Sequence, residues 1–145
     1  MLPALYRELT RTRSIVEGSN RLPYDEMIRR HWVRYLSIVA AGFLENSLKI
    51  ILAEFAKRNS SPHVTNYVEA QLKQFNNPNA DKIFALISSF NQKWATEIEI
   101  FWKEEKKDSI DSIMNIRHNI AHGRNYGITL GNITRYFGEA EKTII

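Results

Sequence analysis

The stretch SIDSIMNIRHNIAHG, residues 109–123, combines a helical pattern with the densest group of reactive side chains in the chain. Its apolar residues recur at steps of three and four, which is typical of an amphipathic helix. Gly123 follows the last periodic residue and is a helix stop, because glycine adopts the left-handed conformation without strain. We therefore predict a helix from Ser109 to His122 that carries an arginine and two histidines in its last turns.

At about 100° per residue, the apolar side chains of this helix cover one arc of roughly 160°. The arc, which must be buried, consists of Ile110, Ile113, Met114, Ile116, Ile120 and Ala121. Asp111, Asn115, His118 and His122 fall on the opposite side. Arg117 points into the middle of the arc, and a guanidinium there stays charged and needs a partner for its donors.

A long helix from about Tyr24 to Arg58 is the predicted centre of the fold. Its middle, Tyr35 to Leu44, is apolar almost all round, and Gly42 can permit a close crossing there. Glu45 lies in the apolar stripe and needs a counter-charge if it is buried. We predict that Glu45 contacts Arg117 and holds the guanidinium in place; the alternative is that Glu45 reaches water at the edge of the stripe.

The remaining segments also predict helices and turns, with no strand alternation of useful length. The expected helices are 4–16, one that begins at Pro62 after a Ser61 cap, one that follows an Asn79 cap, and a last one over about 132–145. Whether the pattern around Asn91 continues a helix or begins a new one stays open. The charge run from Lys103 to Asp108 predicts a solvated turn that leads to the helix of the motif; the alternative is that Lys103, Lys106 and Lys107 guide a polyanion. We expect one all-α domain over 1–145, a bundle of about five to six helices with one long central helix.

Composition limits the functional classes. The chain has 145 residues, a formal net charge of +4 and no cysteine, which excludes thiol catalysis and disulfides. The start has no secretion signal, and the longest apolar stretch is too short to span a bilayer. We expect a soluble cytoplasmic protein with no membrane association. The chain stops at Ile145 without a capping signal, which is compatible with a fragment of a longer protein.

The sequence gives little support for a metal site or for a nucleotide-binding loop. His118 and His122 stand at the i, i+4 spacing at which two imidazoles can share a metal. However, no glutamate follows His118 and no third strong ligand is near. The six glycines are scattered and form no phosphate-binding loop. We therefore expect no metal and no cofactor.

The pattern Arg117-x4-His122, with polar His118 and Asn119 after the arginine and then Gly123, resembles the HEPN superfamily of all-helical domains. The resemblance implies a motif on a late helix, two paired protomers and a ribonuclease cleft between the paired motifs. The resemblance is also compatible with a second function, because many members of that superfamily act as binding modules without activity.

RNA cleavage fits this small set of residues because the attacking 2′-hydroxyl belongs to the substrate. His122 can move protons near neutral pH, and Arg117 can stabilise charge on the phosphate. His118, Asn119 and Glu45 are supporting residues, and Arg124 and Tyr126 border the site as substrate-binding residues. Five residues correspond to about 140° around a helix, so Arg117 and His122 of one helix diverge. Two copies across a twofold axis can bring them into one cleft.

We therefore expect a homodimeric, metal-independent endoribonuclease of toxin or defence type that cleaves single-stranded RNA by 2′-hydroxyl attack. An antitoxin protein is a possible further partner. The alternative is a non-catalytic HEPN-like module that binds a partner protein or a nucleotide, with Glu45 and Arg117 purely structural.

Overall fold

The computed structural model describes residues 2–18, 26–76, 78–102, 104–121 and 130–144, and within these ranges every regular element is a helix. Seven helices follow in order: α1 Pro3–Gly18, α2 Glu26–Asn59, α3 Pro62–Lys73, α4 Ala80–Phe90, α5 Gln92–Phe101, α6 Glu104–Ala121 and α7 Leu130–Ile144. The all-α prediction is therefore confirmed. The predicted count of five to six helices was too low.

The count differs mainly because α4 and α5 are separate helices. Asn91 has extended backbone angles, and its side chain accepts a hydrogen bond from the backbone N–H of Lys93 at 2.9 Å. Its own N–H donates to the carbonyl oxygen of Ile87. A single asparagine thus ends α4 and caps α5, which resolves the alternative that the sequence left open.

The predicted caps of α3 and α4 are confirmed. The Ser61 hydroxyl accepts from the N–H of Val64, with Pro62 at the first helical position, and the Asn79 side chain accepts from the N–H of Lys82. The prediction of a turn for the charge run was wrong, because α6 already begins at Glu104 and residues 104–108 form its first turns. Lys106 lies 4.2 Å from the centre of the Phe101 ring, and Lys107 pairs with Asp81 at 3.4 Å.

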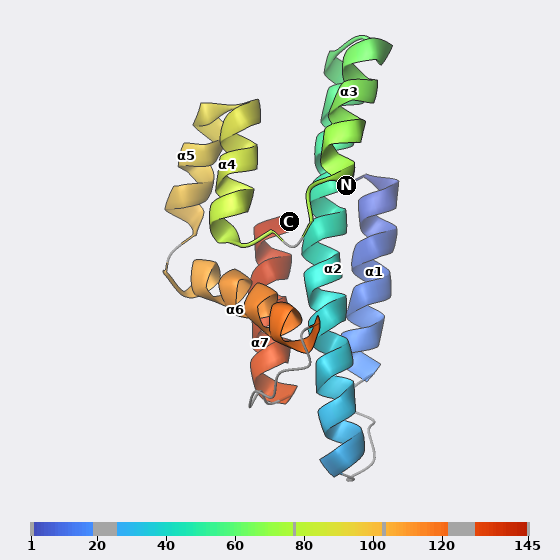
Figure 1. Cartoon of the computed structure of the whole chain (residues 1–145), viewed down its shortest axis with the longest axis vertical. Coiled ribbons are helices and arrows are strands. Elements are labelled where there is room, and N and C mark those ends of the chain that lie inside the picture. Colours follow the sequence, from blue (N-terminus) through green and yellow to red (C-terminus); the bar gives the residue numbers. More distant parts are fainter. Residues whose placement is uncertain (1, 19–25, 77, 103, 122–129, 145) are drawn as a thin grey trace.

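Helix α2 is the central element, and α1, α3, α6 and α7 all pack against it. Figure 1 shows α1 and α7 running along α2, α3 folding back over its C-terminal end, and α6 lying across the bundle between α2 and the α4–α5 hairpin. By length and composition α2 could cross a membrane, but half of its apolar window is buried in the fold. Such burial is typical of the core helix of a bundle.

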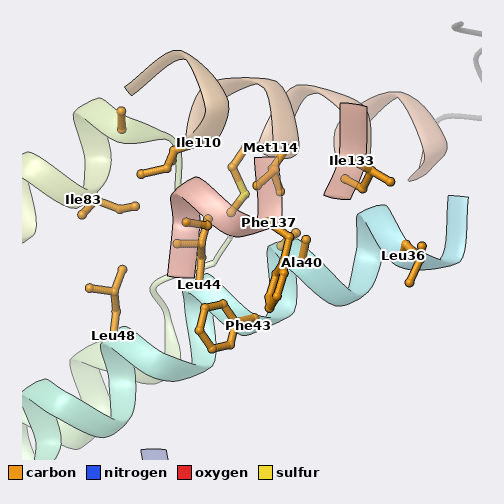
Figure 2. Close-up of a cluster of buried hydrophobic side chains, with 14 of the residues drawn as sticks. Leu36, Ala40, Phe43, Leu44, Leu48, Ile83, Ile110, Met114, Ile133 and Phe137 are labelled. Atoms are coloured by element: carbon orange, nitrogen blue, oxygen red, sulfur yellow. The ribbon is translucent and has the colours of Figure 1, made fainter. Parts of the chain in front are cut away.

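The core lies where α2, α6 and α7 meet (Figure 2). Phe43 of α2 packs edge-on against Phe137 of α7, with ring centres 5.3 Å apart, and both are buried. Ile110, Ile113 and Met114 of α6 are buried in the same cluster. This packing fixes the apolar arc of α6 against α2 and so sets the orientation of the polar residues at the end of α6.

Gly42 does not serve a close helix crossing within the chain, contrary to expectation. A Cβ atom built on Gly42 would meet no atom of the described residues within 4 Å. The buried face of α2 contains Ala41, Phe43 and Leu44, whereas Gly42 is only partly buried.

Candidate functional site

The candidate site lies where the last turns of α6 cross the middle of α2. The Arg117 guanidinium donates through Nη1 to Oε2 of Glu45, 3.4 Å away. This contact joins two helices 72 residues apart in sequence. The predicted Glu45–Arg117 contact is thus confirmed as a geometry, and the functional roles of the two residues stay predictions.

Arg117 is less buried than its position in the helical pattern predicts. Its side chain is 33% exposed, whereas Ile113 and Ile116 on the same helix are buried. The long arginine stem can lie along apolar side chains while its charged end reaches solvent. Glu45 therefore binds the guanidinium, while a third of the Arg117 side chain stays exposed to solvent.

Lys49 is a member of this site that the sequence reading missed. Its Nζ lies 3.0 Å from Oε1 of Glu45, so the two oxygens of one carboxylate face two cations. The signal was present, since a glutamate four residues before a lysine on a helix is a favourable pair. Glu45 is only 14% exposed. The cluster of Glu45, Lys49 and Arg117 carries a net positive charge, which suits a phosphate group.

The polar side of α6 divides into two parts with different surroundings. Oδ1 of Asp111 accepts from the backbone N–H of Ala80 at 2.8 Å, so Asp111 belongs to the contact with α4. Asn115 and His118 are exposed, and Asn119 is half-buried. His118 and Asn119 therefore lie near Arg117 along α6, at the end of the helix where the predicted site should be.

The other predicted site residues, His122, Arg124 and Tyr126, lie outside the residues that the structure describes. The structure thus brings Glu45 and Arg117 together, places His118 and Asn119 on the same end of α6, and leaves the distance between Arg117 and His122 undefined. Among the described residues, no group of three or more histidine, cysteine, aspartate or glutamate side chains has a geometry that could hold a metal ion.

A comparison with protein families matches residues 6–145 to the RiboL-PSP-HEPN family. The chain belongs to this family. The matched residues include all of α2 to α7 and the Arg117–His122 motif, so the resemblance seen in the sequence is confirmed over residues 6–145. Comparisons with curated proteins and with solved structures gave no match. Membership in a HEPN family is compatible with either a nuclease or a binding module.

Proposed function

We propose that this RiboL-PSP-HEPN domain is a metal-independent endoribonuclease that cleaves single-stranded RNA at a site shared by two protomers. The observation that carries the proposal is the state of Arg117, which Glu45 holds in place while a third of its side chain stays exposed. A permanently charged, oriented donor that also reaches solvent is what stabilisation of a phosphate transition state requires.

The proposed reaction uses the 2′-hydroxyl of the RNA as the nucleophile. His122 accepts the proton of that hydroxyl, the 2′-oxygen attacks phosphorus, and the bond from phosphorus to the 5′-oxygen breaks. A proton goes to the departing 5′-oxygen, which the second His122 of the dimer can supply. Arg117 stabilises the charge on the non-bridging oxygens. The products are a 2′,3′-cyclic phosphate and a 5′-hydroxyl.

Two protomers are needed because Arg117 and His122 diverge on one helix by about 140°. Pairing the ends of two α6 helices brings an arginine of one protomer towards a histidine of the other. His118 and Asn119 contribute polar groups beside the phosphate, and Arg124 and Tyr126 contact neighbouring nucleotides. We further propose a cytoplasmic toxin or defence role, in which a cognate antitoxin protein controls the activity.

The test is cleavage of an unstructured, end-labelled RNA by the purified protein in EDTA. We expect activity in the parent, none in Arg117→Ala or His122→Ala, and a smaller loss in His118→Ala. Arg117→Lys keeps the charge but loses the planar pair of donors, so it should be strongly impaired. Asn115→Ala, an exposed change on the same helix, is the matched control and should keep full activity. Activity that survives His122→Ala would remove the motif from the proposal.

The second candidate is a non-catalytic binding module. Its supporting observation is that Arg117 already forms an ion pair with Glu45 across two helices, as a structural arginine does. In that case a folded parent protein would not cleave RNA under any of these conditions. The Arg117→Ala variant would then differ from the parent only in stability.

A further inference from the structure

An apolar cavity of about 400 Å³ lies between the α4–α5 hairpin, α2 and the end of α7. Figure 1 shows the C-terminal end of α7 between this hairpin and α2. Leu48 of α2 points towards Ile83 of α4 (Figure 2), and both line the cavity, together with Ile98 and Phe101 of α5 and Ile144 of α7. Voids in a packed core are rarely larger than a water molecule, whereas sites for small molecules measure about 300–1,000 Å³. The size and the lining of this cavity are therefore those of a ligand site.

Contacts between side chains hold the sides of the cavity in place. Trp94 of α5, which lines the cavity, packs edge-on against Phe55 of α2, with ring centres 4.8 Å apart. On another side, Nε1 of Trp102 donates to the hydroxyl of Thr143, which is also a lining residue, at 3.2 Å. These contacts join the hairpin to α2 and to α7. The cavity is thus formed before a ligand enters, which lowers the entropic cost of binding.

The polar residues that line the cavity are Glu97, Lys142 and Thr143. Two of them are already engaged within α7: the Lys142 ammonium pairs with the Glu139 carboxylate at 3.1 Å, and the Thr143 hydroxyl donates to the Glu139 carbonyl oxygen. Glu97 is exposed, and none of the described residues forms an ion pair with its carboxylate. The two carboxylates and one ammonium therefore leave one negative charge beside an apolar cavity.

We infer that this cavity binds a small apolar amine, whose ammonium group pairs with Glu97 and whose hydrocarbon body lies among the apolar side chains. The aromatic rings of Trp94 and Phe101 on the same lining add attraction for a cation. No described residue of α6 lines the cavity, so this site is separate from the Glu45–Arg117 pair. The inference goes beyond the proposed function and does not rest on it.

Isothermal titration calorimetry at neutral pH tests the class of ligand with three probes of equal chain length: n-octylamine, n-octanoate and n-octanol. The chain has a formal net charge of +4, so general electrostatic attraction favours octanoate. A preference for the amine must therefore come from a local group. We expect octylamine to bind most tightly. Octanoate that binds as tightly as octylamine, or a protein that binds none of the probes, would overturn the inference.

A pair of isosteric variants tests the role of Glu97. In Glu97→Gln the affinity for octylamine should fall about fivefold, because the ion pair is lost, and the affinity for octanol should not change. Glu99→Gln, on the same helix and also exposed, is the matched control because Glu99 does not line the cavity. Both changes lie at exposed positions and leave the fold intact. Equal octylamine affinity in Glu97→Gln and the parent would refute the ion pair.

A second pair of variants tests the cavity itself. Ile98→Trp fills it, and the affinity for all three probes should fall by about tenfold or more. Ile100→Trp makes the same change at a position that is 73% exposed and outside the lining, so it should bind the probes as the parent does. Circular dichroism checks that both variants are folded. Unchanged affinity in a folded Ile98→Trp would overturn the inference, and the Glu97 variants decide the question if Ile98→Trp does not fold.

A second copy of the chain is the other possible occupant of the cavity. It would be identified by a protein that binds none of the probes and whose self-association, measured by light scattering, is weakened by Ile98→Trp. That result would overturn the inference. The titrations contain no RNA, so binding of the amine and cleavage of RNA can each fail while the other holds.

Discussion

The Arg117 guanidinium lies 3.4 Å from the Glu45 carboxylate, and this pair fixes the end of α6 against the middle of α2. The pair is only partly buried, since Arg117 is a third exposed and Glu45 also faces Lys49. Solvent therefore screens the interaction, and the pair is intermediate between a surface ion pair and a buried one. Its contribution to the free energy of unfolding should therefore also lie between those of surface and buried ion pairs.

Glu45→Ala should lower the free energy of unfolding by about 1–2 kcal/mol, because it leaves two cations without their shared carboxylate. The sequence alone, with Arg117 fully buried, would have predicted about 3–5 kcal/mol. Glu45→Gln keeps one acceptor and should cost less. The measurement is urea unfolding followed by circular dichroism. Equal midpoints for Glu45→Ala and the parent would show that the contact does not stabilise the fold.

Cleavage products should end in a 2′,3′-cyclic phosphate and a 5′-hydroxyl, since the nucleophile is the internal hydroxyl of the RNA. Mass spectrometry of a short defined RNA after digestion in EDTA identifies both ends. A substrate with a single 2′-deoxy nucleotide at the cleavage point should resist cleavage there. Products with a 5′-phosphate, or activity that EDTA removes, would support the metal site of His118 and His122 instead.

Asp111→Ala should destabilise the protein by about 1–2 kcal/mol, because the N–H of Ala80 at the start of α4 loses its acceptor. Asn115→Ala, one turn further along the same side of α6, is the matched control and should change stability by less than about 0.5 kcal/mol. Thermal unfolding of both variants measures the difference. If the two variants unfold together, the Asp111 contact contributes no net stability.

Gly42→Ala should raise the free energy of unfolding of the monomer by about 0.5–1 kcal/mol, because alanine favours the helix and its methyl group meets none of the described residues within 4 Å. The measurement is denaturant unfolding at low protein concentration, where association does not contribute. Gly138→Ala in α7, where an added Cβ also meets nothing within 4 Å, should behave alike. A loss of stability at Gly42 alone would mean that the backbone there needs glycine.

Local signals in the sequence predicted most of the helices and their ends. Ser61 followed by Pro62, and Asn79 before an apolar run, carry their own capping chemistry, so these helix starts needed no tertiary information. Lys103 to Asp108 was misread because a run of charges looks alike in a turn and on the outside of a helix. The structure places Lys106 over the ring of Phe101 and pairs Lys107 with Asp81, two contacts that the run of charges itself does not indicate.

The Glu45–Arg117 contact of the site could be predicted from the sequence, because each residue places a charge where an apolar side chain is expected. A charge in an apolar stripe needs a counter-charge, and Glu45 and Arg117 have opposite charges, so each can supply the partner of the other. The sequence could not give the exposure of Arg117, which depends on how closely α2 and α6 approach. The sequence also could not show that Asp111 accepts a hydrogen bond from the N–H of Ala80, because the start of α4 lies 31 residues away. The part played by His122 stays a prediction.

The backbone N–H of Ala80 donates a hydrogen bond to Asp111, so the state of this one amide depends on the position of α6. The first N–H groups of a helix have no acceptor within that helix, so protection of this amide from hydrogen exchange depends on α6 keeping its place. Any event that shifts α6, such as RNA binding at its far end or docking of another protein, should change the exchange rate at Ala80. A single resolved amide signal can thus reveal movement of the site without a label and without an assay of activity.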